Sequence, residues 1–257
     1  MKRKYGKPPF NVIVVHGGPG APGSARPLAE ELSKTHAISE PLQTKNTVDG
    51  QIEELKQTIE QKAQLPVYLV GWSWGAWLSY LVAAKHPSLV RKLILVGSGP
   101  FEAKYAKNIM QTRLDRLSKE EKEKVEEIMV NLQKKETNSE LFKEFGELMD
   151  KADTFNPITL IEKDSIPFEP EIYNGVWTEA AKLRQTGELL EIGRKIICPV
   201  IAIHGNYDPH PAEGVKKPLS KILQNFKFIL LKKCGHKPWC EKEAKNKFFR
   251  ILNKELE

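Results

Sequence analysis

The sequence is poor in cysteine and has no long apolar run. Its 257 residues include only three cysteines, an odd number that favours free thiols over a disulfide framework. No apolar segment follows the basic start of the chain, so neither a signal peptide nor a membrane span is predicted. We therefore expect a cytoplasmic protein that does not bind membranes.

Motifs for metals and cofactors are also missing. Cys234-x-His236-x3-Cys240 matches no common zinc spacing and has no apparent fourth ligand. The glycines near the N-terminus have neither the G-x-G-x-x-G spacing of dinucleotide sites nor the Lys-Ser/Thr ending of a phosphate-binding loop. We expect no metal and no cofactor.

The chain has an excess of positive charge but no basic cluster. The formal net charge is +7, which could indicate a nucleic-acid partner. The lysines are dispersed among glutamates, however, as in residues 119–124, and this is typical of a solvated helix face. We expect no nucleic-acid partner.

Strand and helix patterns alternate along the chain. Strands are predicted at residues 11–15, 36–39, 67–70, 92–96, 200–203 and 226–231, and helices at 25–34, 48–62, 75–85, 212–223 and 241–254. Continuous apolar runs such as Val12-Ile13-Val14-Val15 are typical of parallel strands covered on both faces. The pattern predicts an α/β fold with a doubly wound, mostly parallel sheet and a site at the carboxyl ends of its strands.

The short N-terminal segment limits the sheet. Only ten residues precede the strand at 11–15, too few for a hairpin of ordinary strand length, so we expect about six strands. The short, polar strand at 36–39 would then be an edge, either free or in a homodimer contact.

The strand pattern disappears between Pro100 and Ile196. Ser118-x-x-Glu121 is a capping box that opens an amphipathic helix, a second amphipathic stretch covers residues 141–149, and a third helix is predicted over 172–190. We expect a helical cap at residues 101–195, inserted into a core formed by residues 1–100 and 196–257.

Gly71-Trp72-Ser73-Trp74-Gly75 follows one of the buried strands and precedes a helix. A G-x-S-x-G in that setting is a nucleophile elbow, a turn so tight that it needs glycine two positions before and two positions after the serine. Such a string can also arise by chance, but the flanking strand and helix favour the elbow. Ser73 is therefore the predicted nucleophile.

A serine nucleophile needs a base and an acid that orients the base. Asp208 follows the strand at 200–203, and His236 follows the strand at 226–231. His236 is predicted to take the proton of Ser73, and Asp208 to fix the tautomer of His236. His210 lies too close to Asp208 in sequence to be its natural partner, although it could reach the pocket. His204 is expected to be structural.

His16-Gly17-Gly18-Pro19-Gly20 follows the first strand. Glycines let backbone N–H groups approach a developing oxyanion closely. The predicted oxyanion hole consists of the N–H groups of Gly18 and Trp74, with His16 as a loop anchor. The predicted substrate pocket is apolar and includes residues next to these motifs: Trp72, Phe101, His210 and Trp239.

These motifs, together with the order Ser73, Asp208, His236, resemble the α/β-hydrolases and in particular the proline iminopeptidase group of serine peptidases and its esterase relatives. The resemblance spans almost the whole chain. Proline iminopeptidases carry Asp-Gln-Arg-Gly where this chain has Ser39-Glu40-Pro41-Leu42-Gln43-Thr44. Recognition of a peptide's ammonium group also needs acidic residues, and those of the cap, Glu162, Glu169, Glu171 and Glu179, have no distinguishing spacing.

The predicted activity is hydrolysis of a small carboxylic ester by acyl transfer through a Ser-His-Asp triad. The alternative is an aminopeptidase that acts on short peptides, like the proline iminopeptidases. A third reading is a binding module of the same fold that has lost catalysis.

Overall fold

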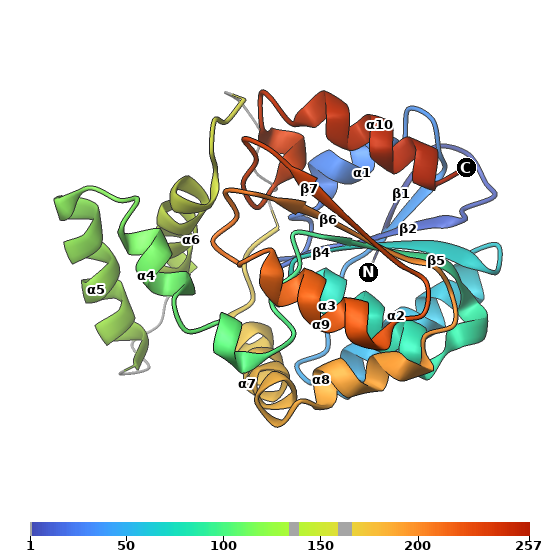
Figure 1. Ribbon diagram of the computed structural model, residues 1–257, viewed down its shortest axis with the longest axis horizontal. Coiled ribbons are helices and arrows are strands. Elements are labelled where there is room, and N and C mark those ends of the chain that lie inside the picture. The colour runs from blue at the N-terminus through green and yellow to red at the C-terminus, as the bar shows by residue number, and fades with distance from the viewer. Residues whose placement is uncertain (1, 134–138, 159–165) are drawn as a thin grey trace.

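The computed structural model of the protein describes residues 2–133, 139–158 and 166–257 and contains one twisted sheet with helices on both faces (Figure 1). The strands are β1 (Lys2–Tyr5), β2 (Val12–Val15), β3 (Ile38–Pro41), β4 (Val67–Trp72), β5 (Val90–Val96), β6 (Val200–Gly205) and β7 (Phe226–Leu231). The helices are α1 (Arg26–Leu32), α2 (Val48–Lys62), α3 (Trp74–Lys85), α4 (Ile109–Leu114), α5 (Lys119–Gln133), α6 (Ser139–Asp153), α7 (Pro170–Thr186), α8 (Glu188–Glu191), α9 (Glu213–Ile222) and α10 (Lys245–Glu255).

The strand order is β1-β3-β2-β4-β5-β6-β7, and every neighbouring pair except β1–β3 is parallel. Parallel strands joined through helices on both faces are the doubly wound arrangement. The predicted fold class is confirmed.

The N-terminal residues correct the predicted strand count. β1 pairs antiparallel with β3, with Lys4 opposite Ser39, so the sheet has seven strands and β3 is an inner strand rather than an edge. A four-residue edge strand needs backbone hydrogen bonds but no apolar pattern, and the basic segment around Lys4 gave no such pattern. Because β1 lies beside β3 and not beside β2, the described part of the chain has no hairpin in front of β2, as expected.

Two apolar layers hold the helices to the sheet. The side chains of β2 are all buried, as expected for a central parallel strand. α1 and α10 cover one face, whereas α2, α3 and α9 cover the other (Figure 1). α3 has buried residues on all sides, which suits a helix enclosed by the sheet and other helices. None of the helices among the described residues is long and apolar enough to cross a membrane.

Helices α4 to α7 lie between β5 and β6 in the chain, and α4, α5 and α6 extend away from the sheet in Figure 1. Helices α4, α5 and α6 enclose a small apolar core of their own that includes Leu117, Val125 and Met149. The predicted capping box is present: Ser118 N–H donates to Glu121 Oε2 at 3.0 Å, and Glu121 N–H donates to Ser118 Oγ at 3.3 Å. These helices therefore form an insertion in the sheet domain. The predicted boundaries of this insertion, residues 101 and 195, remain a prediction.

Candidate active site

Ser73 lies in a strained turn between β4 and α3. Its φ of 55° and ψ of −118° are unusual for a residue with a side chain. The turn is closed by glycines: a Cβ on Gly71 would lie 2.2 Å from Gly75 O, and one on Gly75 would lie 2.3 Å from Val15 O. The sequence therefore forces Ser73 out at the carboxyl end of the sheet, as an elbow requires.

The loop after β2 lies beside this turn. Gly18 has a φ of +89°, which glycine adopts without strain. The described residues supply no acceptor for Gly18 N–H or for Trp74 N–H, the latter because Trp74 is the first residue of α3. Both donors are therefore available to an oxyanion.

His16 anchors the same loop. Its Nδ1 lies 2.7 Å from Gly17 O, and Gln43 N–H donates to its Nε2 at 3.3 Å. These partners assign a neutral ring with the proton on Nδ1. Burial lowers the pKa of His16 to about 4. His16 is thus a structural link between two loops, as expected.

Asp208 and His236 meet at the ends of β6 and β7. His236 Nδ1 lies 2.8 Å from Asp208 Oδ2, and because an ionised carboxylate only accepts, Nδ1 carries the proton. In the neutral ring, Nε2 at the opposite side is then the nitrogen without a proton. His236 and Ser73 line the same cavity, although no hydrogen bond joins Ser73 Oγ to His236 among the described contacts. Catalytic hydrogen bonds are often long in the absence of substrate.

His210 also binds Asp208, which corrects the expectation that it lies too close in sequence to do so. His210 Nδ1 is 2.8 Å from Asp208 Oδ1, and His210 N–H donates to the same oxygen at 2.9 Å. The intervening Pro209 turns the chain back far enough for this contact. His204 is buried below them, with Nε2 2.8 Å from His210 O, in a structural position as expected.

The three imidazoles decide the charge of Asp208. Burial alone would raise the pKa of this carboxyl group, but attraction to His236, His210 and His204 holds the pKa well below its usual range. Burial lowers the pKa of His210 to about 4, against the opposing effect of Asp208. An ionised Asp208 with a neutral His210 is the state that these shifts favour near neutral pH.

The loop that carries His236 is fixed from two sides. Trp72 Nε1–H donates to His236 O at 3.0 Å, and His236 N–H donates to Asp153 O at 2.9 Å. The buried carboxylate of Glu241 accepts from Gly235 N–H at 2.6 Å and from the N–H groups of residues 155 and 156 at 2.8 Å. The position of His236 therefore depends on both the sheet and the segment that follows α6.

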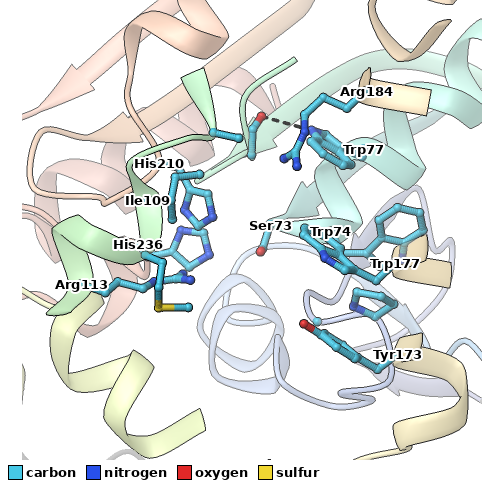
Figure 2. A pocket seen from close by; sticks show the side chains of 15 residues that line it. Ser73, Trp74, Trp77, Ile109, Arg113, Tyr173, Trp177, Arg184, His210 and His236 are labelled. Atoms are coloured by element: carbon cyan, nitrogen blue, oxygen red, sulfur yellow. Dashed lines mark hydrogen bonds between the residues drawn. The ribbon is translucent and has the colours of Figure 1, made fainter. Parts of the chain in front are cut away.

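A cavity of about 320 Å³ opens over Ser73. It is lined by fifteen of the described residues: Gly18, Pro19, Ser73, Trp74, Trp77, Gly99, Ala106, Ile109, Met110, Arg113, Tyr173, Trp177, Arg184, His210 and His236. Figure 2 shows Ser73 between His236 on one side and Trp177 on the other. The cavity is thus formed jointly by strand-end loops and by α4 and α7.

The predicted pocket residues are only partly in this lining. Ser73, Gly18, Trp74, His210 and His236 line the cavity, but Trp72, Phe101 and Trp239 do not. Trp72 alternates to the opposite face of β4 from its neighbour, where its ring packs edge-on against Trp239 at 5.1 Å. Phe101 is fully buried against Tyr80, with ring centroids 4.8 Å apart. These three aromatic side chains belong to the core.

Sequence reasoning missed Trp77 of α3 and four further polar or aromatic residues of the lining, which are Arg113, Tyr173, Trp177 and Arg184. All four come from α4 and α7. Their spacing in α7 could have indicated a shared face, because Tyr173, Trp177 and Arg184 recur at helical intervals. Which way that face points depends on packing that the sequence does not specify.

Two sets of side chains near the site are of types that can bind metals: Asp208 with His210 and His236, and the cysteines Cys234 and Cys240. Asp208, His210 and His236 have ligand atoms within 4.8 Å of one another, but those atoms already hydrogen-bond among themselves. Burial raises the pKa of the Cys240 thiol to about 12 and also raises that of Cys234, so both thiols are protonated near neutral pH.

The description "alpha/beta hydrolase fold" belongs to a family model that matches residues 11–242. The chain belongs to the alpha/beta hydrolase family. This family accounts for the sheet order, the elbow and the strand-end loops described above. A comparison with curated proteins gives no match.

Several solved structures resemble this one over nearly their whole length. VinJ is 17% identical with a TM-score of 0.73, and the match covers 99% of this chain and 93% of VinJ. A proline iminopeptidase from Mycobacterium smegmatis is 14% identical with a TM-score of 0.66 and the same coverage. A thermophilic esterase from Thermogutta terrifontis is 18% identical with a TM-score of 0.62, covering 100% of this chain and 93% of the esterase. At these identities the likeness shows the fold.

Proposed function

We propose that this alpha/beta hydrolase is a serine hydrolase that cleaves a carboxylic ester by acyl transfer through Ser73. The observation that carries the proposal is the hydrogen bond of 2.8 Å between His236 Nδ1 and Asp208 Oδ2 beside the strained elbow of Ser73. In the neutral ring this bond places the proton on Nδ1, so Nε2 is the nitrogen that can accept a serine proton.

In the proposed reaction, Ser73 Oγ attacks the ester carbonyl carbon while its proton moves to His236 Nε2. The carbonyl oxygen becomes negative and accepts hydrogen bonds from Gly18 N–H and Trp74 N–H. The C–O bond to the leaving group then breaks, and His236 gives its proton to the departing alkoxide. Water, deprotonated by His236, releases the acid from Ser73 by the same steps.

The composition of the cavity supports an ester over a peptide with a free N-terminus. An aminopeptidase needs a carboxylate for the substrate's ammonium group, and none of the fifteen lining residues is acidic. Glu169 and Glu171 are exposed, and Glu179 accepts a hydrogen bond from Val48 N–H. Glu162 lies outside the described residues. The proline iminopeptidase-like activity therefore remains the alternative.

A catalytically inactive binding module is the least favoured function. The predicted nucleophile, base, acid and oxyanion donors are all present in this chain. The cytoplasmic location and the homodimer stay predictions, and the homodimer no longer has β3 as a free edge.

The test is a substrate panel on purified enzyme. We expect short-chain 4-nitrophenyl esters to be hydrolysed and prolyl 4-nitroanilide to be cleaved far more slowly. Ser73→Ala should abolish turnover and labelling by a fluorophosphonate probe without unfolding the protein. Asp208→Asn should lower kcat by up to about 10⁴-fold, because it favours the wrong imidazole tautomer.

Two results would decide against the proposal. Prolyl anilide cleavage that greatly exceeds ester cleavage would establish the aminopeptidase alternative. A wild-type enzyme that is neither active on the panel nor labelled at Ser73 would favour the binding module.

A further inference from the structure

Two arginines line the cavity over Ser73, and only one has a carboxylate partner. Arg113 donates from Nε and Nη2 to the two oxygens of Asp153, at 2.7 and 2.6 Å. The Arg184 side chain has no hydrogen bond or ion pair with any residue that the structure describes. The charge of Arg113 is thus compensated by Asp153, whereas no carboxylate among the described residues compensates that of Arg184.

Two tryptophan rings lie beside the Arg184 guanidinium. Its central carbon is 5.4 Å from the ring centroid of Trp77 and 6.0 Å from that of Trp177. Cation–π attraction of this kind stabilises the positive charge without supplying an oxygen acceptor. The N–H groups of the guanidinium need such acceptors. The two tryptophans therefore hold Arg184 in the wall of the cavity, and its donors have no acceptor among the described residues.

The environment of Arg184 makes an uncompensated charge costly. The side chain is partly buried, and loss of solvent lowers its pKa. Its ordinary pKa is so high that the guanidinium remains charged near neutral pH. By contrast, Arg194 on the outer surface has Glu191 at 2.7 Å. A partly desolvated cation with unpaired donors is stabilised when an anion binds to it.

We propose that Arg184 binds a carboxylate of the substrate, so that the ester cleaved at Ser73 has an acyl group ending in a carboxylate. This inference rests on the proposed esterase function. The planar fork of arginine matches a carboxylate with two parallel hydrogen bonds. A single uncompensated charge suits a monoanion, whereas a phosphate dianion would leave one negative charge without a partner.

The arrangement around Ser73 assigns the carboxylate to the acyl part. His236 must protonate the leaving group, so the leaving group lies on the His236 side of Ser73. In Figure 2, Arg184 and Trp77 lie across the cavity from His236. The apolar middle of the acyl group would pack on Trp77 and Trp177.

The experiment compares esters of equal chain length. The anionic substrates are the mono-4-nitrophenyl esters of adipic and suberic acid, and the neutral substrates are 4-nitrophenyl hexanoate and octanoate. Each is assayed with the wild type, Arg184→Gln, Arg184→Lys and Lys182→Gln. Lys182 is exposed on the same helix, so Lys182→Gln removes one positive charge without touching the cavity.

For at least one chain length, kcat/KM of the anionic ester should fall about 10- to 100-fold in Arg184→Gln, the range expected for lost hydrogen bonds to a charged group. The fall should appear mainly in KM, and the neutral esters should change little. Arg184→Lys should recover part of the loss, and Lys182→Gln should behave like the wild type. An equal loss for anionic and neutral esters, or no loss in Arg184→Gln, would overturn the proposal.

Binding without turnover separates this proposal from the proposed function. Calorimetry of adipate and suberate with the Ser73→Ala variant should show binding that disappears when Arg184→Gln is added. If the wild type hydrolyses no ester but this Arg184-dependent binding persists, the esterase proposal fails and the carboxylate site stands. If neutral esters are hydrolysed but neither dicarboxylate binds, the carboxylate site fails alone. Tighter Arg184-dependent binding of inorganic phosphate than of both dicarboxylates would also overturn the carboxylate.

Discussion

His16 shows how one buried side chain makes the stability of this fold depend on pH. Its pKa falls from an ordinary value of 6.5 to about 4 on folding. Between those values the unfolded chain takes up a proton that the folded protein resists, so stability should decrease as the pH is lowered through this window. His16 should contribute a loss of about 2 kcal/mol between pH 7.5 and 4.5.

Urea unfolding of the wild type and of His16→Asn at these two pH values measures that contribution. The difference between the two pH values should be smaller in the variant by the stated amount. His210, whose pKa is also lowered to about 4, is present in both proteins and cancels. An equal pH dependence in both proteins would show that His16 is already protonated in the fold.

Gly97 is a second residue with a predicted effect of its own, because it lies directly against His236. It has a φ of +50°, and a Cβ there would lie 2.7 Å from His236 O and 3.2 Å from His236 Nδ1. Gly97→Ala should therefore displace His236 and lower kcat about 10- to 100-fold, since a shift near 1 Å is enough for such a loss.

Gly187→Ala is the matched control for this variant. Gly187 also has a positive φ, of +85°, but nothing lies within 4 Å of its missing Cβ. Its substitution should cost about 1 kcal/mol of stability through backbone strain and leave kcat unchanged. If both variants kept full activity in the ester assay, contact with Gly97 would not position His236.

At the scale of elements, β1 adds a strand by means that the sequence pattern conceals. Tyr5 OH donates to the buried Glu40 Oε2 of β3 at 2.8 Å. Tyr5→Phe should lower the free energy of unfolding by about 1.5 kcal/mol, because a hydrogen bond to a carboxylate is lost. Tyr105→Phe is the control, because the Tyr105 hydroxyl has no hydrogen bond within the described residues. Equal stability of the two variants in urea unfolding would contradict this role for Tyr5.

The elements that sequence reasoning predicted share a strong apolar pattern. β2 is buried throughout and α3 at every residue except Lys85, so local composition alone identifies them. β1 is held by backbone pairing with β3 and by side-chain contacts such as that between Tyr5 and Glu40, which no local pattern encodes. The core position of Trp72, in contrast, follows from the sequence, because alternation along a strand places its side chain on the face opposite those of its neighbours.

The candidate site divides in the same way. Ser73, Asp208 and His236 could be predicted because strand ends and glycines mark them. The contact between His210 and Asp208 depends on a turn within two residues, and the place of Arg184 depends on how α7 packs over the sheet. Such features come from tertiary packing and have no local sequence mark.

At the scale of the whole molecule, Glu241 links the sheet to the segment after α6. Its buried carboxylate accepts three backbone hydrogen bonds, one of them from Gly235 next to His236. Glu241→Gln replaces one acceptor oxygen by a donor and should cost about 2 to 3 kcal/mol of stability, because a buried N–H is left unpaired. It should also reduce kcat, since the His236 loop loses its support.

Glu243→Gln is the control, because Glu243 is exposed and binds only the Asn156 side chain, at 2.9 Å, among the described contacts. That variant should stay within about 0.5 kcal/mol of the wild type. Thermal unfolding and the ester assay on both variants measure the two effects. A Glu241→Gln enzyme with unaltered stability and kcat would show that the link is dispensable.

The backbone contact between Asp153 and His236 limits how this enzyme can be engineered. One way to change the substrate range of such a fold is to replace its helical insertion with that of a relative. Here the incoming segment would also have to supply the carbonyl that receives His236 N–H and the two amides that bind Glu241. A graft that ignores residues 153–156 and 235–241 would change the position of His236 together with the pocket, so the two stretches have to be transplanted as a pair.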